Sequence, residues 1–233
     1  MPGLLLALSL LASPADLRQA EQAYLARNFP AAEKAYGAAL AAGNESADLE
    51  YDMGTAAAQA GDIGQAVLHL ERALVLSPWD GDARDNLDRV RDKRVDKVVG
   101  QDLGESPLQR LLRGLPAAEL SWTFAALWIL GFLLLVLRRR RSWFRPLGLA
   151  CAVFGLGLGG LSWACERADG IPFGVVLAKV TPVRAGPDPK LPASFEVHEG
   201  LKVLLEERDA GYQRIRLANG LEGWVEAGGV EKI

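Results

Sequence analysis

The chain is poor in the residues that build disulfide frameworks, metal centres and basic surfaces. Its 233 residues include two cysteines and two histidines, and 26 Lys and Arg face 29 Asp and Glu, for a formal charge of −3. Two cysteines are too few for a disulfide framework, and with two histidines they nearly exclude a His/Cys metal site. A nucleic-acid binder carries a basic surplus, which this chain lacks. We therefore predict no metal, no cofactor and no nucleic-acid partner.

Patterns typical of catalysis are also missing. The sequence shows no phosphate-binding loop, no carboxylate pair in an apolar frame, and no nucleophile with a matching base. His69 lies in an apolar helical stretch, where we expect it to pack beside the core. His198 lies in a predicted turn, where we expect a solvated side chain. The sequence therefore predicts a protein that is not an enzyme and has no catalytic residues.

The first of three apolar stretches lies at the N-terminus. Residues 1–12 are mostly apolar but, at about 1.5 Å per residue, too short to cross a bilayer. Small residues follow at Ser13 and Ala15, as at the cleavage site of a secretory signal. We predict a signal peptide over residues 1–15, although the stretch has no Lys or Arg before it. A buried first helix is the alternative.

Two longer apolar stretches, residues 120–137 and 146–165, are uncharged and long enough to span a bilayer. Neither has the polar stripe of a soluble core helix. Residues 138–145 between them contain five arginines, and short arginine-rich loops stay in the cytoplasm. We predict a transmembrane helical hairpin over 118–166 in a bacterial inner membrane, with loop 138–145 cytoplasmic and both soluble domains periplasmic. Gly155 and Gly159 are expected to face the neighbouring span, with homodimerisation as the alternative.

Residues 16–98 are rich in alanine and have apolar residues at helical spacing. Two sets of apolar residues coincide when the sequence is shifted along itself by one constant number of residues. The first set is Ala32, Tyr36, Ala39 and Leu40, and the second is Ala66, Leu70, Ala73 and Leu74. That offset equals the period of the helix pairs in the tetratricopeptide repeat, about 34 residues. The second copy resembles this family at Met53-Gly54, Gly61-Asp62, Ala66, Ala73 and Pro78, whereas the first copy has Ala20 for the glycine and Asn44 for the proline. We predict an all-α repeat domain over 16–98, ending in a charge-rich solvating helix over 85–97.

The resemblance implies that the first helix of each pair lines a concave binding surface. The candidate partner-binding groove consists of Glu21, Tyr24, Tyr51, Thr55, Gln59 and Arg89, although each can equally be a solvated or packed side chain. A groove of this size suits a short peptide or a partner helix. Residues 99–117 are rich in glycine and proline, so we predict a linker there.

Residues 171–233 alternate between apolar and polar residues, as strands do. We expect five strands, at 175–184, 194–197, 202–207, 212–217 and 221–225, closed into a small all-β barrel. Asn219-Gly220 predicts a hairpin with a primed turn. Pro182 has no N–H to donate, so its strand should be an edge strand or bulged.

This segment resembles a bacterial SH3-like domain. The resemblance rests on Val183–Pro187, Glu199-Gly200, Tyr212–Arg216 and Asn219–Val225. It gives three candidate surface residues, Arg184, Tyr212 and Trp224, of which Trp224 can alternatively be a packing residue.

The whole chain is therefore predicted to be a multidomain membrane protein, and its domain order resembles the BatE family of aerotolerance-operon proteins. That resemblance implies membrane-bound von Willebrand A-type partners and a MoxR-type AAA+ ATPase system. We expect a non-enzymatic, membrane-anchored scaffold in a stress-related envelope complex. The alternatives are a cell-wall sensor or anchor whose SH3-like domain binds peptidoglycan, and an accessory to an enzyme on another chain.

Overall fold

A computed structural model describes residues 14–96, 108, 111–112, 115, 117–136, 143–169 and 172–233. Most of the predicted signal peptide, most of the linker and arginines 138–141 lie outside the described residues. The chain divides into two compact units. The first combines Met1–Gly104 with Pro172–Ile233, and the second is Glu105–Ile171.

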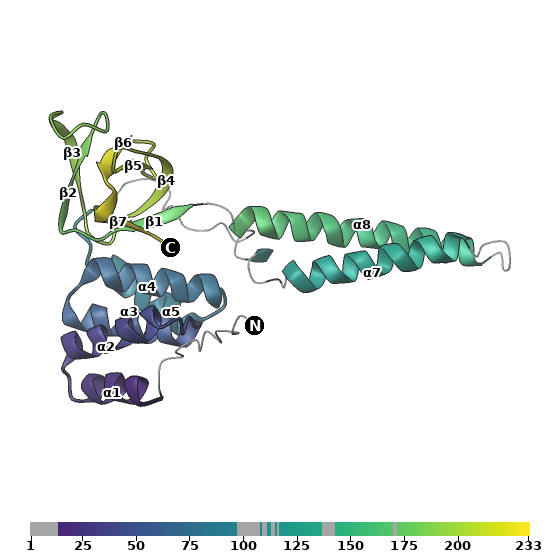
Figure 1. The fold of residues 1–233 in the computed structure, drawn as a ribbon, viewed down its shortest axis with the longest axis horizontal. Coiled ribbons are helices and arrows are strands. Elements are labelled where there is room, and N and C mark those ends of the chain that lie inside the picture. The colour runs from purple at the N-terminus through teal and green to yellow at the C-terminus, as the bar shows by residue number, and fades with distance from the viewer. Residues whose placement is uncertain are drawn as a thin grey trace, which may run out of the picture. The chain divides into compact units, whose positions relative to one another are not determined.

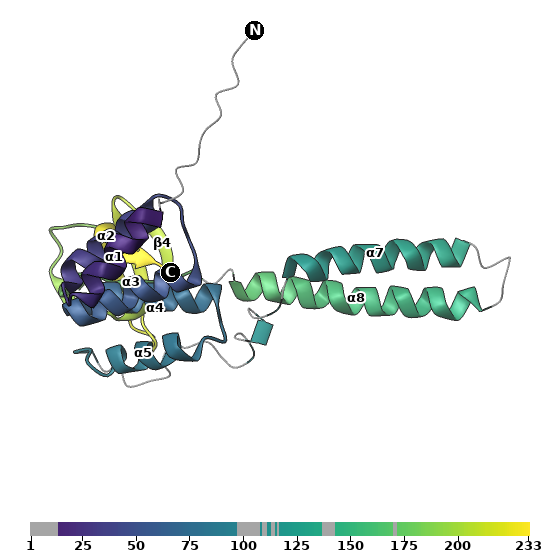
Figure 2. The same ribbon diagram turned by 90° about the horizontal axis from the view of Figure 1, so that it is seen from below.

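The first unit begins with an array of five helices, of which α5 lies at the edge (Figure 2). These helices are α1 (Pro14–Leu25), α2 (Phe29–Ala41), α3 (Ala47–Ala60), α4 (Ile63–Leu76) and α5 (Gly81–Arg91). The starts of α2 and α4 differ by one tetratricopeptide period of about 34 residues, and so do the starts of α3 and α5. The repeat period of the sequence is therefore also a period of the structure.

Local side chains fix where these helices begin. Ser46, Asp62 and Asp80 precede α3, α4 and α5, and each side chain accepts a hydrogen bond from a backbone N–H in the first turn. Gly61 ends α3 with a φ of 88°, a conformation that glycine adopts without steric cost. The helix boundaries thus follow from capping residues visible in the sequence.

Small residues let the helices pack closely. A Cβ on Gly54 of α3 would lie 2.8 Å from Cγ of Leu70 on α4, so only glycine permits this approach. Ala20, Tyr36 and Met53 belong to one buried cluster that joins α1, α2 and α3. Ala57, Leu70 and Leu87 belong to a second, which joins α3, α4 and α5. The array is held together by these two apolar clusters.

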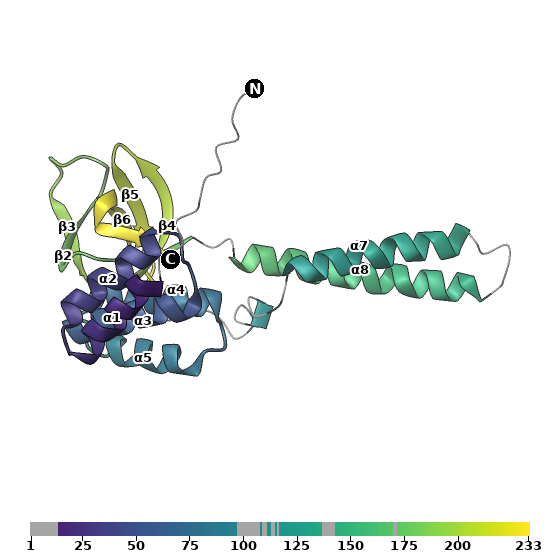
Figure 3. The ribbon, with the colours of Figure 1, turned by 60° about the horizontal axis from the view of Figure 1, so that its bottom comes forward.

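The first unit also contains a seven-stranded antiparallel sheet (Figure 3). Its strands are β1 (Phe173–Val176), β2 (Val180–Arg184), β3 (Ala193–His198), β4 (Lys202–Asp209), β5 (Tyr212–Arg216), β6 (Glu222–Glu226) and β7 (Val230–Lys232). A short 3₁₀ helix, Ala227–Gly229, lies between β6 and β7. The strand order is β3-β2-β6-β5-β4-β1-β7, with β3 and β7 at the edges. The expected closed barrel is therefore wrong, because the sheet stays open.

Three other strand predictions need correction. The expected strand 175–184 is two strands, because the chain leaves the sheet at Leu177, whose N–H donates to the carbonyl of Gly229 at 2.9 Å. Strand β7 was not predicted, since so short a strand carries no periodic signal. At the β5–β6 turn Gly220 has a φ of 86° and Asn219 has no positive φ, so the loop is not a two-residue primed turn. Instead the N–H of Gly220 donates to the carbonyl of Leu217 at 3.0 Å, as in a three-residue hairpin loop.

The expectation for Pro182 is confirmed. Strand β2 is bulged between Val183 and Arg184 where it pairs with β3. Its pairing with β6 is limited to Arg184 and Trp224. Pro182 therefore lies in a part of β2 that is not paired with β6, where a missing N–H costs few hydrogen bonds of the sheet.

The helical array and the sheet share a hydrophobic cluster. Val175 of β1 is buried among residues of α3, α4 and α5, and Leu177 and Ile233 pack against the same cluster. A Cβ on Gly64 of α4 would lie 2.9 Å from the carbonyl oxygen of Leu177, so helix and strand backbones touch here. Figure 1 shows β1 and β7 as the part of the sheet next to α4. The array and the sheet, which the two apolar stretches separate in the sequence, therefore form one body.

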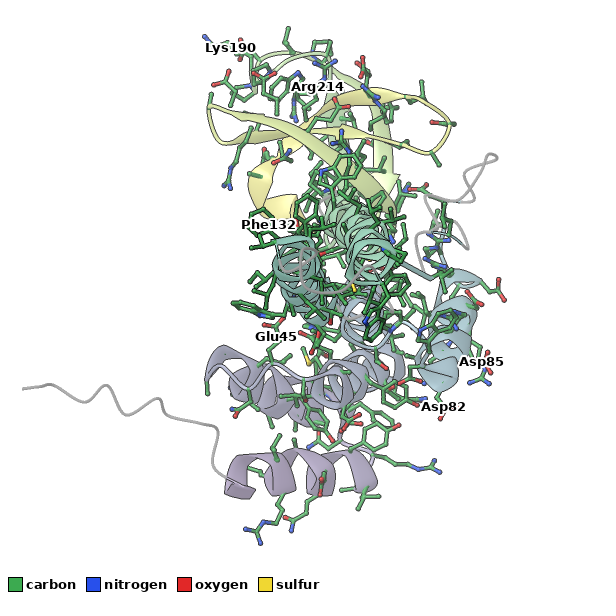
Figure 4. The ribbon with its side chains drawn as sticks, turned by 90° about the vertical axis from the view of Figure 1, so that its right-hand side faces the viewer. Glu45, Asp82, Asp85, Phe132, Lys190 and Arg214 are labelled. Atoms are coloured by element: carbon green, nitrogen blue, oxygen red, sulfur yellow. The ribbon has the colours of Figure 1, made fainter. Side chains whose placement is uncertain are left out.

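The second unit is an antiparallel helix pair, α7 (Ala117–Val136) and α8 (Phe144–Asp169). Both helices are long and apolar enough to cross a membrane. Glycines form their interface: Gly155 lies against Trp128, and Gly159 against Phe124. This GxxxG pair faces the neighbouring helix, as expected. The outer side chains are apolar and exposed, among them Phe132 (Figure 4).

Candidate partner-binding surfaces

The first helices α3 and α5 bring together three of the six predicted groove residues. The side-chain nitrogen of Asn86 on α5 donates to the hydroxyl of Tyr51 at 3.0 Å and to that of Thr55 at 3.4 Å. Arg89 in turn donates to the amide oxygen of Asn86 at 2.8 Å. Asn86 was not among the predicted groove residues, although it lies one repeat period after Asp52 on the preceding first helix. Gln59 lies one turn beyond Thr55 and is exposed.

The other two groove residues lie on α1, in a more acidic environment. Glu21 is exposed, and the half-buried ring of Tyr24 packs edge-on against Phe29 with centroids 5.5 Å apart. Burial and then the charges of neighbouring Asp48 and Glu21 raise the pKa of Asp52 on α3. This end of the face therefore suits a cationic group, whereas the α5 end carries Arg89.

The hydroxyl of Tyr36 lies in the same electrostatic environment. Burial, followed by the charge of Asp52 and then those of Glu21 and Tyr24, raises its pKa to about 12. The tyrosine therefore stays neutral at physiological pH. Because Tyr36 is only 4% exposed, it adds neither a charge nor a contact surface to the acidic end of the face.

On the sheet, two of the three candidate surface residues lie side by side. Trp224 of β6 pairs with Arg184 of β2 on one side and with Arg214 of β5 on the other, and cross-strand partners share a face. The Trp224 ring is half-buried. Arg214 (Figure 4) is held by Glu222 at 3.0 Å. Tyr212 was expected at the surface but is 7% exposed, so little of it can meet a ligand.

A cleft that the sequence did not reveal lies between the ends of α2 and α4 and the C-terminus. Its volume is about 620 Å³, and its lining includes Leu40, Glu45, Glu50, His69, Arg72, Val75, Leu76 and Ile233. His69 is 6% exposed, which confirms that it packs in the interior. Its Nδ1 lies 2.6 Å from the buried Oε2 of Glu50, and its Nε2 lies 3.1 Å from Oε1 of Gln65. This pair joins α3 to α4 at the back of the cleft.

A buried charge cluster joins the array to the sheet. Glu71 of α4 is 5% exposed; one of its oxygens lies 2.7 Å from Nζ of Lys202 on β4 and the other 2.5 Å from Arg91 on α5. Burial by itself raises the pKa of Glu71, but Lys202 and then Arg91 outweigh it and hold the pKa below its ordinary value. The carboxylate is therefore charged at neutral pH, as a buried ion pair requires.

Residues 85–97, the predicted solvating helix, are not solvated throughout. Asp82 and Asp85 do point away from the array (Figure 4), but Arg91 points inward to Glu71. Asp96 accepts two hydrogen bonds from His198, one from its backbone N–H at 2.6 Å and one from Nδ1 at 2.9 Å. The prediction that His198 is a solvated turn residue is thus wrong, because the turn contacts the end of the helical array.

Within the part of the chain that the structure describes, no three His, Cys, Asp or Glu side chains gather where they can hold a metal ion. What the surfaces offer is hydrogen bonding, charge and a partly exposed aromatic ring, which are the means of binding. No protein-family model and no curated protein matches this chain.

Proposed function

We propose that this chain is a membrane-anchored, non-enzymatic scaffold that binds protein partners on the first-helix face of a short tetratricopeptide-type array. The observation that carries the proposal is the polar cluster of Tyr51, Thr55, Asn86 and Arg89 across two first helices. It places donors and acceptors on an open face, where an extended peptide or a helix can pair with them.

The apolar surface of the helix pair supports membrane anchoring. Ile129, Phe132 and Val153 are 71%, 70% and 68% exposed. Soluble proteins rarely expose so continuous an apolar surface to water, whereas lipid chains cover it without cost. The arginines at 138–141 and 145 favour a cytoplasmic loop, so we propose that the array and the sheet lie in the periplasm of a bacterial inner membrane.

The repeat assignment is supported by the regular spacing of the helix starts and by the close helix approach at Gly54. The SH3-like assignment is supported by the short antiparallel strands and the Gly220 turn. Together with the domain order, these features support membership of the BatE family. On that basis the partners we propose are membrane-bound von Willebrand A-type proteins of a MoxR-type ATPase system.

Photo-crosslinking in the native membrane tests the binding face. A photoreactive amino acid at Gln59, which is exposed on α3, should give discrete adducts with a partner protein. The matched control is the same residue at Lys34, which is exposed on the second helix α2. Equal adduct patterns from both positions would show that the first-helix face is not the binding surface.

Fusion reporters test the orientation separately. Alkaline phosphatase joined after Glu105 or after Ile233 should be active, and green fluorescent protein at the same positions should be dark, because both sites are proposed to be periplasmic. Fluorescence at either position places that region in the cytoplasm and ends the envelope proposal.

A peptidoglycan-binding function remains the second candidate, because Trp224 lies between Arg184 and Arg214 on one face of the sheet. The half-exposed indole can stack on a sugar, and the arginines beside it can pair with a peptide carboxylate. Full-length protein in detergent should then sediment with cell-wall sacculi, and Trp224→Ala should release it. Sedimentation unchanged by Trp224→Ala would argue against this surface.

A further inference from the structure

We propose that Val75, Leu76 and Trp79, here called the α4-end patch, rest on the lipid surface and seat the array and sheet against the bilayer. The inference rests on the proposed membrane anchoring and goes beyond it. It assigns a lipid contact to a surface outside the spanning helices.

The patch is apolar, exposed and held in a defined shape. Val75 and Leu76 end α4 and are 40% and 45% exposed, and Trp79 in the following turn is 60% exposed. Most of the rest of α4 is buried; Leu68 and Leu70 are 0% exposed. The turn is fixed by a hydrogen bond from the N–H of Asp80 to the carbonyl of Ser77 at 3.1 Å. Trp79 belongs to none of the hydrophobic clusters that the described residues of the unit form.

The course of α4 shows at which end of the unit the patch lies. Helix α4 runs antiparallel to β1 (Figure 1). Its first turn meets the end of β1, because Gly64 packs on the backbone of Leu177. Two turns later Glu71 binds Lys202, whose ammonium lies 4.7 Å from the ring centre of Phe173, the first residue of β1.

The lengths of the two elements agree with this alignment. Seven helical residues rise about 10 Å, and the four strand residues from Leu177 back to Phe173 span about 13 Å. Continuing α4 from Glu71 to Leu76 adds about 7 Å in the same direction. The α4-end patch therefore lies past the start of β1, at the end of the unit where the chain enters at Pro172.

The chain that enters there comes directly from α8. Helix α8 ends at Asp169 and β1 begins at Phe173, so three residues join them. A fully extended link of this length reaches about 14 Å. Any bilayer that α8 crosses is thus within reach of the end of the unit that carries the patch.

This tether favours lipid over a second copy or a free partner as the occupant. A surface tethered to a bilayer by a link of about 14 Å meets lipid at a high effective concentration, without the cost of bimolecular association. Tryptophan is the side chain best suited to the interfacial zone, because its ring is apolar and its N–H reaches polar headgroups. Val75 and Leu76, at the end of α4, add two exposed aliphatic side chains to that contact.

Quenching by brominated lipid tests the contact in the full-length protein. The protein is placed in nanodiscs of ordinary phosphatidylcholine or of phosphatidylcholine brominated in the upper acyl chain, and its tryptophan emission is recorded. Subtracting the spectrum of Trp79→Phe isolates the emission of Trp79. Trp122→Phe isolates an exposed residue near the N-terminal end of α7 as the positive control, and Trp224→Phe isolates a residue of the sheet as the negative control.

We expect the bromine to lower the Trp79 and Trp122 signals to about half or less and to leave the Trp224 signal unchanged, because interfacial side chains reach the upper acyl chains. A quenched Trp122 with an unquenched Trp79 overturns the patch and leaves the membrane anchor standing. Lack of quenching at both positions overturns the anchor and the patch together. Protection of Trp79 by a bound protein or second copy, seen as an unquenched signal, also counts against lipid.

Discussion

Replacing Lys202 with methionine tests whether the array and the sheet are stabilised as one body. Nζ of Lys202 lies 2.7 Å from Oε2 of Glu71, and both side chains are 7% exposed. Methionine keeps most of the volume of the lysine stem but removes the ammonium group. Arg91, whose side chain is 20% exposed, then remains as the cation beside Glu71.

The expected loss follows from the burial of Glu71. Removing one partner of a buried ion pair costs about 3–5 kcal/mol, because the other charge stays buried without it. Arg91 still neutralises part of that charge, so we expect Lys202→Met to lower the free energy of unfolding by about 2–3 kcal/mol. The matched control is Glu231→Gln, which breaks the outer ion pair with Arg72. The side chains of Arg72 and Glu231 are 25% and 48% exposed, so this change should cost less than about 1 kcal/mol.

Urea unfolding of the full-length protein in detergent measures both changes. The tryptophans isolated on the array (Trp79) and on the sheet (Trp224) should report the same midpoint, because one cooperative body unfolds in one step. Lys202→Met should shift both midpoints together. A shift seen by Trp224 alone, or a midpoint equal to that of Glu231→Gln, would refute the reasoning that this pair joins the two regions.

The same pair predicts a dependence on pH. Lys202 and Arg91 overcome the effect of burial and hold the pKa of Glu71 below its ordinary value of 4.5. A lowered pKa means that the stabilisation is present above pH 4.5 and is lost as pH falls through the folded-state value. The difference in stability between the native protein and Glu71→Gln should therefore be constant near neutral pH and should shrink below pH 4.5.

Three further changes test local features by the same urea assay. Gly220→Val should cost about 1–3 kcal/mol, because the φ of 86° disfavours a β-branched residue; Gly228→Val, at a position with open space and no positive φ, should cost less, and equal losses would contradict the turn geometry. Gly54→Ala should cost about 1–3 kcal/mol, because its Cβ would lie 2.8 Å from a leucine on α4, whereas Gly37→Ala, with its nearest atom at 3.6 Å, should stabilise by up to about 1 kcal/mol. Burial and neighbouring carboxylates raise the pKa of Asp52, so the charged side chain destabilises the fold above pH 3.8. Asp52→Asn should therefore stabilise the protein by no more than about 0.5 kcal/mol above that pH and not below it. A loss of stability at neutral pH would contradict this.

The elements with the strongest local signals were predictable from the sequence. The capping residues Ser46, Asp62 and Asp80 begin their helices, and the two uncharged stretches form the long apolar helices. The bulge near Pro182 also followed, from the missing N–H of one residue. Each of these features depends on interactions within a few residues, so the order of residues is sufficient to reveal it.

The groove was predictable only in part. Tyr51, Thr55 and Arg89 follow from the repeat register, because a fixed period puts equivalent residues on one face. Asn86, which links all three, was missed, since the contact depends on the distance between α3 and α5 rather than on either helix alone.

Only the tertiary structure decided that the array and the sheet are one body. Glu71 and Lys202 are 131 residues apart, and Asp96 and His198 are 102 apart. The strand break at Leu177 depends on the same junction. From the sequence, a charged residue on a helix is predicted to be solvated, because no local pattern indicates a partner more than a hundred residues away. The periodicity of a helix or a strand determines which face of that element is apolar, whereas the free energy of burying two such faces together decides which elements meet.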